Sequence, residues 1–355
     1  MNSLLSAESE EAALEHLHAA GCTDGLPVVV PTPERVERML LASGLDGDLL
    51  LGEMGPGGGV ASARHVAIAA VMAGCLPDYM PVVVAAVKAV IDPRFDLTEM
   101  QATTHCTAPL ILVNGPARTD CGPIASGFGA LGPGFRANAS IGRALRLAMI
   151  NIGGGRPGSS DMALLGHPGK FTYCLAEDEE HSPLPPLHVG LGFEANDSVV
   201  TVIGAEAPHS VIFSATGDAN ADAEGLLHAL AAALGHLGGN NAILTGGSAV
   251  VVLNPDHAQT LVSAGLDRAS IQARLHALCA HPVGTLKRLA PAFARGDDDS
   301  KLRHCFQAPE DILVLMAGGS GLYSMVMPTW CAGPHRNRAV SVKVDLDLFC
   351  ELPGA

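Results

Sequence analysis

The sequence predicts an α/β protein built from two related α/β halves with a β-rich segment between them. One observation is a pattern that occurs twice, in which a helix is followed by a short apolar strand and an Asn-Gly-Pro or Asn-Pro turn. The pattern surrounds the strand expected at 109–113 and returns at 249–253, so it indicates an internal duplication. The alternative is a chance recurrence of elements that are common in α/β proteins. A second observation is the composition, since 41 glycines and 4% aromatic residues in a chain that is 48% hydrophobic are typical of a tightly packed protein rich in turns.

The 355 residues are enough to bury a large core and to form more than one domain. We divide the chain into an N-terminal α/β half at 1–160, a β-rich segment at 161–221 and a C-terminal α/β half at 222–355. The middle segment is set apart because its apolar runs are short and alternate in the manner of strands.

The elements of the N-terminal half are predicted from caps and apolar periodicity. Pro33 occupies the first position of a helix that Thr32 caps. Ser140 is a good N-cap, apolar residues follow it at helical spacing, and three glycines at 153–155 end that helix. The glycines of 52–60 indicate a flexible loop. In order, we expect helices at 8–20, 33–43, 62–74, 81–90 and 140–152, and strands at 28–30 and 109–113.

The remaining elements alternate strands with helices. A helix rich in Ala and Leu at 222–238 ends in two glycines, which is a typical C-terminal signal. Residues 280–308 carry a run of three aspartates, and we expect an exposed connector there. In order, we expect strands at 188–193, 198–205, 211–214, 249–253 and 311–316, and helices at 222–238, 256–264 and 268–279.

Glycines and arginines around one expected helix predict an anion site. Arg136 and Asn138 would lie just ahead of the helix N-terminus, where free N–H groups and the helix dipole favour an anion. Arg136 could bind a carboxylate or phosphate through two hydrogen bonds, and Arg143 lies on the flank of the same helix. Asp24, in the turn Thr-Asp-Gly-Leu-Pro, and Ser320, in a Gly-Gly-Ser-Gly turn, complete the predicted substrate-binding residues. The alternative is that these arginines pair with surface carboxylates.

A tight polar loop at 166–170 and the acidic run behind it supply groups that could transfer protons. His167 and Lys170 lie in the loop among glycines and a proline, and Glu177 begins the acidic run. His105 lies in a polar stretch of threonines just before an expected strand. We predict His167, Lys170, Glu177 and His105 as catalytic acids and bases. The alternative is a surface turn followed by an acidic run that faces water.

Fifteen histidines raise the question of a metal site. Catalytic zinc needs about three His, Glu or Cys ligands, and the sequence offers no HxH or HExxH spacing to supply them. The candidate ligands are scattered along the chain: His105, His167, Glu177 and His209. No nucleotide-binding fingerprint is present, so ATP and NAD are not implied, and a divalent metal is the one cofactor that stays open.

Four segments carry a resemblance to a known family. They are TDGLPVVVPTPERVERML at 23–40, QATTHCTAPLILVNGP at 101–116, RANASIGRALRLAMINIGG at 136–154 and GHPGKFTYCLAEDEE at 166–180. Over residues 20–345 the chain resembles the UGSC-associated proteins of bacteria, in which a small UGSC domain with a cysteine or selenocysteine precedes or accompanies this type of chain. The resemblance implies a UGSC-type thiol protein as a partner. The UGSC tetrapeptide itself is absent from this sequence, so the resemblance assigns a redox role to none of its residues.

The net charge limits the kinds of binding partner that we expect, and the cysteines indicate the cellular compartment. A formal net charge of −15 argues against nucleic acid and anionic membranes as partners. Residues 1–20 lack the basic region and the long apolar core of a signal peptide, and the longest apolar stretch, at 81–91, is too short to span a bilayer. Nine cysteines without a CxxC pair favour free thiols in a reducing compartment. We therefore expect a cytoplasmic protein, and its Gly- and Ala-rich apolar composition favours a homo-oligomer.

Together these residues predict an enzyme. We expect a hydrolase or lyase that cleaves a polar bond, C–N or C–S, in a small anionic substrate bound between the two halves near strand carboxyl ends. One alternative is a thiol-redox subunit that works with a UGSC-type partner, in which case Cys106 or Cys121 should be reactive. Two further alternatives are a metal-dependent hydrolase and a non-enzymatic protein that binds a small anion.

Overall fold

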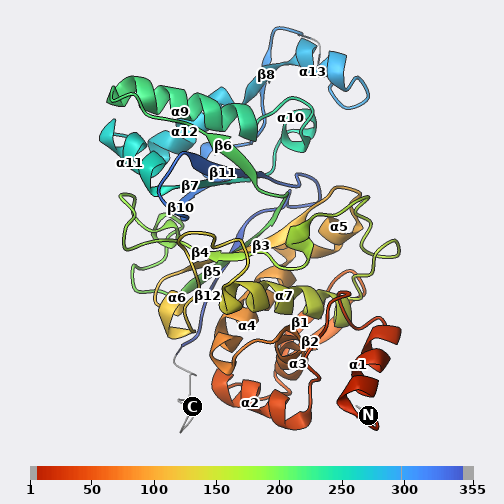
Figure 1. Ribbon diagram of the computed structural model, residues 1–355. Helices are drawn as coiled ribbons and strands as arrows, with labels where there is room; N and C mark the ends of the chain where they lie inside the picture. Colours follow the sequence, from red (N-terminus) through yellow and green to blue (C-terminus); the bar gives the residue numbers. More distant parts are fainter. Residues whose placement is uncertain (1–5, 297, 347–355) are drawn as a thin grey trace.

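The computed structural model describes residues 6–296 and 298–346 and confirms the α/β class. Its core is a stack of four layers (Figure 1). Two four-stranded sheets lie face to face, and helices cover the outer face of each sheet. None of the helices in the described part of the chain combines the length and the hydrophobicity that crossing a membrane requires.

Sheet one, the lower sheet in Figure 1, has the strand order β12 (Val340–Lys343), β5 (Val199–Ala205), β3 (Ala108–Asn114) and β4 (Cys174–Ala176). The β3–β4 pair is parallel, and the β3–β5 and β5–β12 pairs are antiparallel. Two helices pack on its outer face, α4 (Met80–Ile91) and α7 (Arg136–Asn151). Behind them lies α3 (Ala63–Ala73), which packs on α7.

Sheet two has the strand order β10 (Ile312–Met316), β7 (Ala249–Leu253), β11 (Tyr323–Pro328) and β6 (His209–Ile212). The β7–β10 pair is parallel, and the β7–β11 and β11–β6 pairs are antiparallel. Its outer face is covered by α9 (Ala219–Leu234), α11 (Pro255–Ser263) and α12 (Arg268–Leu278).

Alternation along the central strands explains why two layers of core form. In β3, Leu110 and Leu112 belong to the core between the two sheets, whereas Ile111 and Val113 belong to the core under the helices. Successive side chains of a strand point to opposite faces, so a strand that is apolar at every position is buried on both faces. The continuous apolar runs seen in the sequence therefore mark the strands that lie between helices and a second sheet.

The two sheets have the same order of parallel and antiparallel strand pairs, and the chain crosses from one sheet to the other twice. Both contain a parallel pair joined through helices, followed by two antiparallel neighbours. The chain leaves β5 of sheet one to enter β6 of sheet two, and it leaves β11 of sheet two to enter β12 of sheet one. An isolated bridge between Ala205 and Thr329 links the sheets where these crossings occur. This matching pattern is consistent with two related halves, while the duplication itself stays a prediction.

The other elements surround this core. A basal group contains α1 (Glu10–Ala19), α2 (Pro33–Ser43) and the hairpin of β1 (Leu50–Met54) and β2 (Gly59–Ser62). An arm that projects from the body contains β8 (Ala280–Pro282), α13 (Val283–Leu289) and β9 (Leu302–His304) (Figure 1). The short helices are η1 (Pro77–Tyr79), η2 (Pro93–Phe95), α5 (Leu97–Ala102), α6 (Ala117–Asp120), η3 (Pro168–Lys170), α8 (Leu187–Gly190), α10 (Asn240–Leu244) and η4 (Pro309–Asp311).

Several predicted elements were wrong in detail. The loop expected at 52–60 is the β1–β2 hairpin, and the connector expected at 280–308 holds the arm. The strand expected at 188–193 is occupied by α8, because a short apolar run does not distinguish helix from strand. Residues 28–30 join no sheet in the described structure. The helix expected from Ser140 begins at Arg136, and the Ser140 hydroxyl donates to the Arg136 carbonyl inside it.

Candidate functional site

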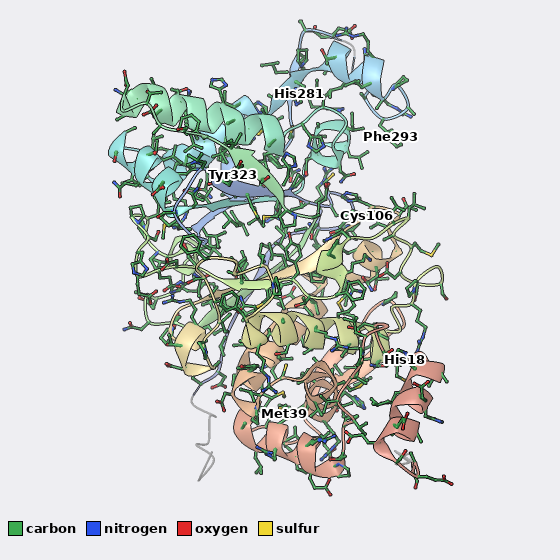
Figure 2. All side chains as sticks on the ribbon, viewed as in Figure 1. His18, Met39, Cys106, His281, Phe293 and Tyr323 are labelled. Carbon is green, nitrogen blue, oxygen red and sulfur yellow. The ribbon has the colours of Figure 1, made fainter. Side chains whose placement is uncertain are left out.

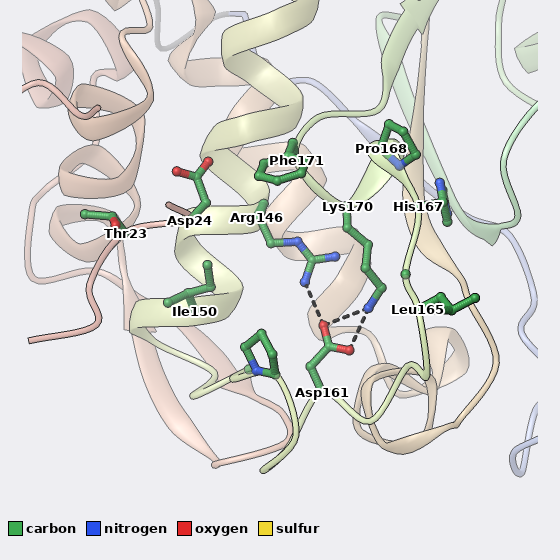
Figure 3. Close-up of a pocket in the computed structure, with 13 residues that line it drawn as sticks. Thr23, Asp24, Arg146, Ile150, Asp161, Leu165, His167, Pro168, Lys170 and Phe171 are labelled. Carbon is green, nitrogen blue, oxygen red and sulfur yellow. Dashed lines mark hydrogen bonds and ion pairs between the residues drawn. The ribbon is translucent and has the colours of Figure 1, made fainter. Parts of the chain in front are cut away.

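A cavity of about 530 Å³ opens beside α7. Its walls come from the turn that holds Thr23 and Asp24, from one face of α7, and from the loop that connects α7 to β4 (Figure 3). All lining residues lie between Thr23 and Phe171, so this cavity is built from the N-terminal part of the chain and not between the two halves. The lining residues are Thr23, Asp24, Arg146, Ile150, Gly155, Pro157, Asp161, Leu165, Gly166, His167, Pro168, Lys170 and Phe171.

Local sequence explains how these residues meet. Arg146 and Ile150 are four residues apart in α7 and therefore share the helix face that borders the cavity. Glycines end α7 and let the chain turn back across that face. A side chain at Gly155 would displace the buried Gln101 amide, because a Cβ there would lie 2.5 Å from its Nε2.

A charged cluster of two cations and one carboxylate forms the polar wall of the cavity. Nζ of Lys170 lies 2.6 Å and 2.7 Å from the two carboxylate oxygens of Asp161. Nη1 of Arg146 lies 3.5 Å from Oδ2 of the same carboxylate. Figure 3 shows Arg146 and Lys170 approaching Asp161 from separate elements. Because two cations share one carboxylate, the cluster carries one unbalanced positive charge.

Burial makes this excess charge costly. Arg146 is only 6% exposed, and burial lowers the pKa of its guanidinium, opposed by the charge of Asp161. Burial also lowers the pKa of the Lys170 ammonium; the hydrogen bond to Asp161 opposes this shift, and the nearby charge of Arg146 adds to it. Nη2 of Arg146 is buried and makes no hydrogen bond to any described residue. An unpaired buried donor on a cation favours binding of an anion.

Most of the other side chains that line the cavity are apolar. Ile150, Pro157, Pro168 and Phe171 line the cavity together with Leu165. Leu165 is 94% exposed and stands at the mouth. A cavity with a few fixed polar groups and apolar walls is the usual form of a small-molecule site.

His167 lines the cavity, but both of its ring nitrogens are engaged. Nδ1 accepts a hydrogen bond from the Gly169 N–H at 3.1 Å, which leaves the proton on Nε2 to donate to the Ala205 carbonyl at 3.2 Å. Burial lowers the pKa of this imidazole, so it is held neutral. The geometry gives His167 a positioning role for the loop that carries Lys170.

Two predicted substrate-binding residues, Asp24 and Arg143, bind each other. Nε and Nη2 of Arg143 lie 2.7 Å and 2.9 Å from the two carboxylate oxygens of Asp24. Nη2 also donates to the Pro27 carbonyl. This bidentate pair fixes the turn that forms one rim of the cavity, and it neutralises the Asp24 carboxylate.

Arg136 and Asn138 lie away from the cavity. Nε and Nη2 of Arg136 donate to the Gly74 carbonyl at the C-terminus of α3. The Asn138 amide is buried, and its hydrogen bonds go to backbone groups of β4 and of the glycine-rich loop at 125–134. They include the N–H and carbonyl of Ala125 and the carbonyl of Cys174. Asn138 thus holds the loop in place, and Arg136 lies in a separate hollow.

Glu177 lies in a second polar cluster, at the carboxyl ends of β3 and β4. Its Oε2 accepts hydrogen bonds from the Asn114 amide and the Leu187 N–H, and its Oε1 lies 3.5 Å from Nη2 of Arg268, a residue of α12. The side chain is fully buried, and burial raises its pKa to about 7. It belongs to a network that connects the two sheets.

The other candidate residues lie apart from one another. Nε2 of His105 lies 2.9 Å from Oε1 of Glu206, and its Nδ1 has no partner among the described residues. His209 is exposed on β6, and Ser320 is exposed in the loop after β10. Across residues 6–296 and 298–346, no three His, Cys, Asp or Glu side chains converge to hold a metal ion.

The two cysteines proposed as reactive differ in their surroundings. Cys121 is buried, and burial raises the pKa of its thiol to about 12. Cys106 is partly exposed. Of the two, Cys106 is the thiol that a reagent or a partner could reach.

A scan against models of known protein families finds no match for this chain, and a search of curated proteins finds no significant match. The resemblance to the UGSC-associated proteins therefore stays a prediction. The function has to be inferred from the geometry of the site.

Sequence reasoning missed three residues of the cavity region: Arg146, Asp161 and Gln101. The spacing of Arg143 and Arg146 placed both on one helix flank, but it did not show which one is buried. Asp161 lies in a Ser-Ser-Asp turn that no motif distinguishes. Gln101 is fully buried, and neither atom of its amide has a partner among the described residues, a feature that only a structure can reveal.

Proposed function

We propose that this protein is an enzyme of the hydrolase or lyase class that cleaves a polar bond, C–N or C–S, in an anionic substrate bound beside α7. The observation that supports the proposal most directly is the buried Arg146 guanidinium, with a free Nη2, next to Lys170 on a shared carboxylate. One monoanion would balance the cluster. A neutral surface turn or a solvated ion pair carries no unbalanced charge, so it does not favour an anion in this way.

The roles follow from the geometry. Arg146, whose side chain lines the cavity, attracts and binds the anionic group of the substrate. Lys170 and Asp161, joined by two short hydrogen bonds, exchange the proton that the reaction needs. A lowered Lys170 pKa suits this role, because a proton donor and acceptor works best when its pKa approaches the working pH.

The apolar side chains of the cavity indicate which kind of carboxylate would fill it. A cavity of about 530 Å³ would be mostly empty around a two- or three-carbon acid. Ile150, Pro157, Pro168 and Phe171 would instead contact an alkyl or aryl group. We infer a carboxylate with an apolar body of several carbons.

A thiol reaction with a UGSC-type partner is the second candidate, and Cys106 favours it. Its thiol is partly exposed, whereas the Cys121 thiol is buried. This candidate predicts that iodoacetamide modifies Cys106 in the native protein faster than it modifies Cys22, the other partly exposed described cysteine. Equal rates for the two thiols would count against it.

The proposal includes a cytoplasmic, homo-oligomeric enzyme. All cysteines that the structure describes are unpaired thiols, which suits a reducing compartment. Light scattering coupled to size-exclusion chromatography measures the oligomeric state, and a monomer at micromolar concentration would contradict that part.

The test is an untargeted turnover assay. Purified protein is incubated with a small-molecule extract of bacterial cells, and mass spectrometry in negative-ion mode follows which anions disappear and which products appear. We expect the wild type to consume at least one amphipathic carboxylate and K170M to leave it intact. K287M is the matched control, because Lys287 also pairs with an aspartate, Asp299, at 2.7 Å, but on the arm. Equal consumption by wild type and K170M would overturn the assignment.

A further inference from the structure

We propose that Lys170 forms an imine with a carbonyl carbon of the substrate, so that the substrate is an oxo acid whose carboxylate binds to Arg146. This inference rests on the proposed function, since it assumes that the cavity is the reaction site. It replaces simple proton transfer by Lys170 with a covalent step. It also names the substrate class: an oxo acid with an apolar body.

An amine that forms an imine needs a wall position in a roomy cavity and a proton acceptor in contact with it. Lys170 lines the cavity, and both carboxylate oxygens of Asp161 lie within 2.7 Å of its Nζ. Asp161 can therefore take a proton from the ammonium and return it to the carbonyl oxygen. No other titratable side chain hydrogen-bonds to this nitrogen within the described residues.

The surroundings of Nζ stabilise the neutral amine more than water does. The side chain is 16% exposed in a cavity lined largely by apolar residues, and a second cation, Arg146, shares its carboxylate. Burial and a neighbouring cation are the two devices by which enzymes prepare lysines for imine chemistry. Both act here to lower the pKa of Lys170 from its ordinary value of 10.5.

Arg146 supplies the second point of attachment. Arg146 lines the same cavity as Lys170, and its Nη1 is directed to the carboxylate that Lys170 also binds, so a substrate carboxylate bound to Arg146 would lie next to Lys170. A 2-oxo or 3-oxo acid places its carbonyl carbon one or two bonds from the carboxylate carbon. The proximity of the two cations on one carboxylate therefore fits an oxo acid better than an acid with a distant carbonyl group.

The step balances without an oxidant or reductant. Asp161 takes a proton from the Lys170 ammonium, and the amine attacks the carbonyl carbon to form a C–N bond while the carbonyl oxygen takes that proton back. Asp161 then takes a second proton from the nitrogen and gives it to the hydroxyl oxygen. The C–O bond breaks, the oxygen leaves as water, and the nitrogen lone pair completes the iminium ion. The net change converts one ammonium and one carbonyl into one iminium and one water.

The iminium explains how a polar bond would break. It withdraws electrons and acidifies the neighbouring C–H, so Asp161 can remove that proton to give an enamine. The enamine then expels an amine or a thiol from the next carbon, the leaving group takes the proton from Asp161, and a C=C bond forms. Water hydrolyses the iminium, regenerates Lys170 and releases an unsaturated oxo acid. The products are those of a C–N or C–S lyase.

The test traps the iminium with sodium cyanoborohydride. The probe is 2-oxo-4-phenylbutanoate, and peptide mass spectrometry measures which lysines carry the reduced adduct. We expect Lys170 to be labelled about tenfold faster than Lys287 or more, because each unit by which a pKa falls raises the neutral fraction about tenfold near neutral pH. The matching 2-hydroxy acid has no carbonyl group and should label no lysine.

Two variants make the test specific. K170R keeps a cation on Asp161 and should fold but leave no adduct at that position. R146M should lower the labelling rate at Lys170 with the oxo acid, and it should not lower it with the uncharged ketone 4-phenylbutan-2-one. The inference would be overturned if Lys170 were labelled no faster than Lys287. It would also be overturned if the oxo acid labelled wild type and R146M at equal rates. If Lys170-dependent turnover of the extract persists without trapping, the proposed function stands and only the imine is wrong.

Discussion

Asp161 is the residue on which the charge balance of the cavity depends, because it is the shared partner of Arg146 and Lys170. Removing its charge would leave two partly or fully buried cations facing each other. We expect D161N to lower the free energy of unfolding by about 2–4 kcal/mol. Urea denaturation followed by circular dichroism measures this loss.

A double variant separates charge repulsion from lost packing. If repulsion causes the loss, D161N combined with K170M should recover part of it, since only one cation then remains in the cavity. The same substitution pattern on the arm, D299N with K287M, should change stability by less than about 1 kcal/mol, because that pair is exposed. A double variant no more stable than D161N alone would contradict the charge argument.

Glu177 makes stability depend on pH. Burial raises its pKa from 4.5 to about 7, so the folded state holds this proton more tightly than the unfolded state. Stability should therefore fall as the pH rises from about 4.5 to about 7 and stay level above. The difference in unfolding free energy between wild type and E177Q should shrink by about 3 kcal/mol over this range. Denaturation at several pH values tests it, and a pH-independent difference would contradict it.

At the scale of elements, α7 positions both the cavity and the glycine-rich loop, and it approaches β4 closely. A Cβ at Gly142 would lie 2.4 Å from Oγ1 of Thr172 and 2.5 Å from the Tyr173 backbone nitrogen. We expect G142A to destabilise the protein by about 1–3 kcal/mol, despite the better helix propensity of alanine.

The matched control is Gly225, a helical glycine of α9. A Cβ there would meet only the ring of Phe213, at 3.0 Å, and that ring is on a side chain that can shift. G225A should therefore change stability by less than about 1 kcal/mol in either direction. Thermal unfolding of both variants compares them, and equal losses would contradict the close α7–β4 contact.

Elements with a strong apolar periodicity could be predicted from the sequence. For elements with a weak periodicity, the type or the first residue was predicted wrongly. Apolar runs and caps located β3, β7, β10, α2, α9 and α12 within a few residues. The start of α7 was wrong because Ser140 resembles a cap, while the observed N-cap, Phe135, makes no side-chain cap hydrogen bond. α8 was mistaken for a strand because its apolar run is too short to show a period.

The sequence indicated which region of the chain holds the site, but not which charged side chains pair with each other there. Residues 136–170 supply most of the cavity wall, including Lys170. Sequence could not show that Arg143 would be neutralised by Asp24, 119 residues away, or that Arg146 would be buried without a full set of partners. Such pairings depend on tertiary contacts that leave no trace in local patterns.

At the scale of the whole molecule, the strand exchange joins the two sheets into one unit. β6 lies in sheet two although the strand before it, β5, lies in sheet one, and β12 lies in sheet one although β11 lies in sheet two. A common apolar core lies between the sheets. We expect a single cooperative unfolding transition, with equal calorimetric and van't Hoff enthalpies. Two separated transitions in a calorimetric scan would contradict this coupling.

The arm is the part of the molecule that depends least on this core. Leu289, Phe293 and Leu302 are all more than half exposed on it, and Figure 2 shows Phe293 far from the body. Five of the 21 Lys and Arg residues of this acidic chain lie within 280–304. Its exposed apolar and basic side chains make the arm the first region to substitute if the predicted homo-oligomer is found.

The measurement that tests the central claim most directly is calorimetric titration with 4-phenylbutanoate, an amphipathic carboxylate that has no carbonyl group to react. We predict binding at one site per chain in the wild type and at least about tenfold weaker binding in R146M, since a charge-assisted hydrogen bond to a buried cation contributes more than 1 kcal/mol. R274M, which removes an exposed arginine paired with Glu224, should bind like the wild type. Undetectable binding to the wild type, or equal affinities of wild type and R146M, would contradict the account.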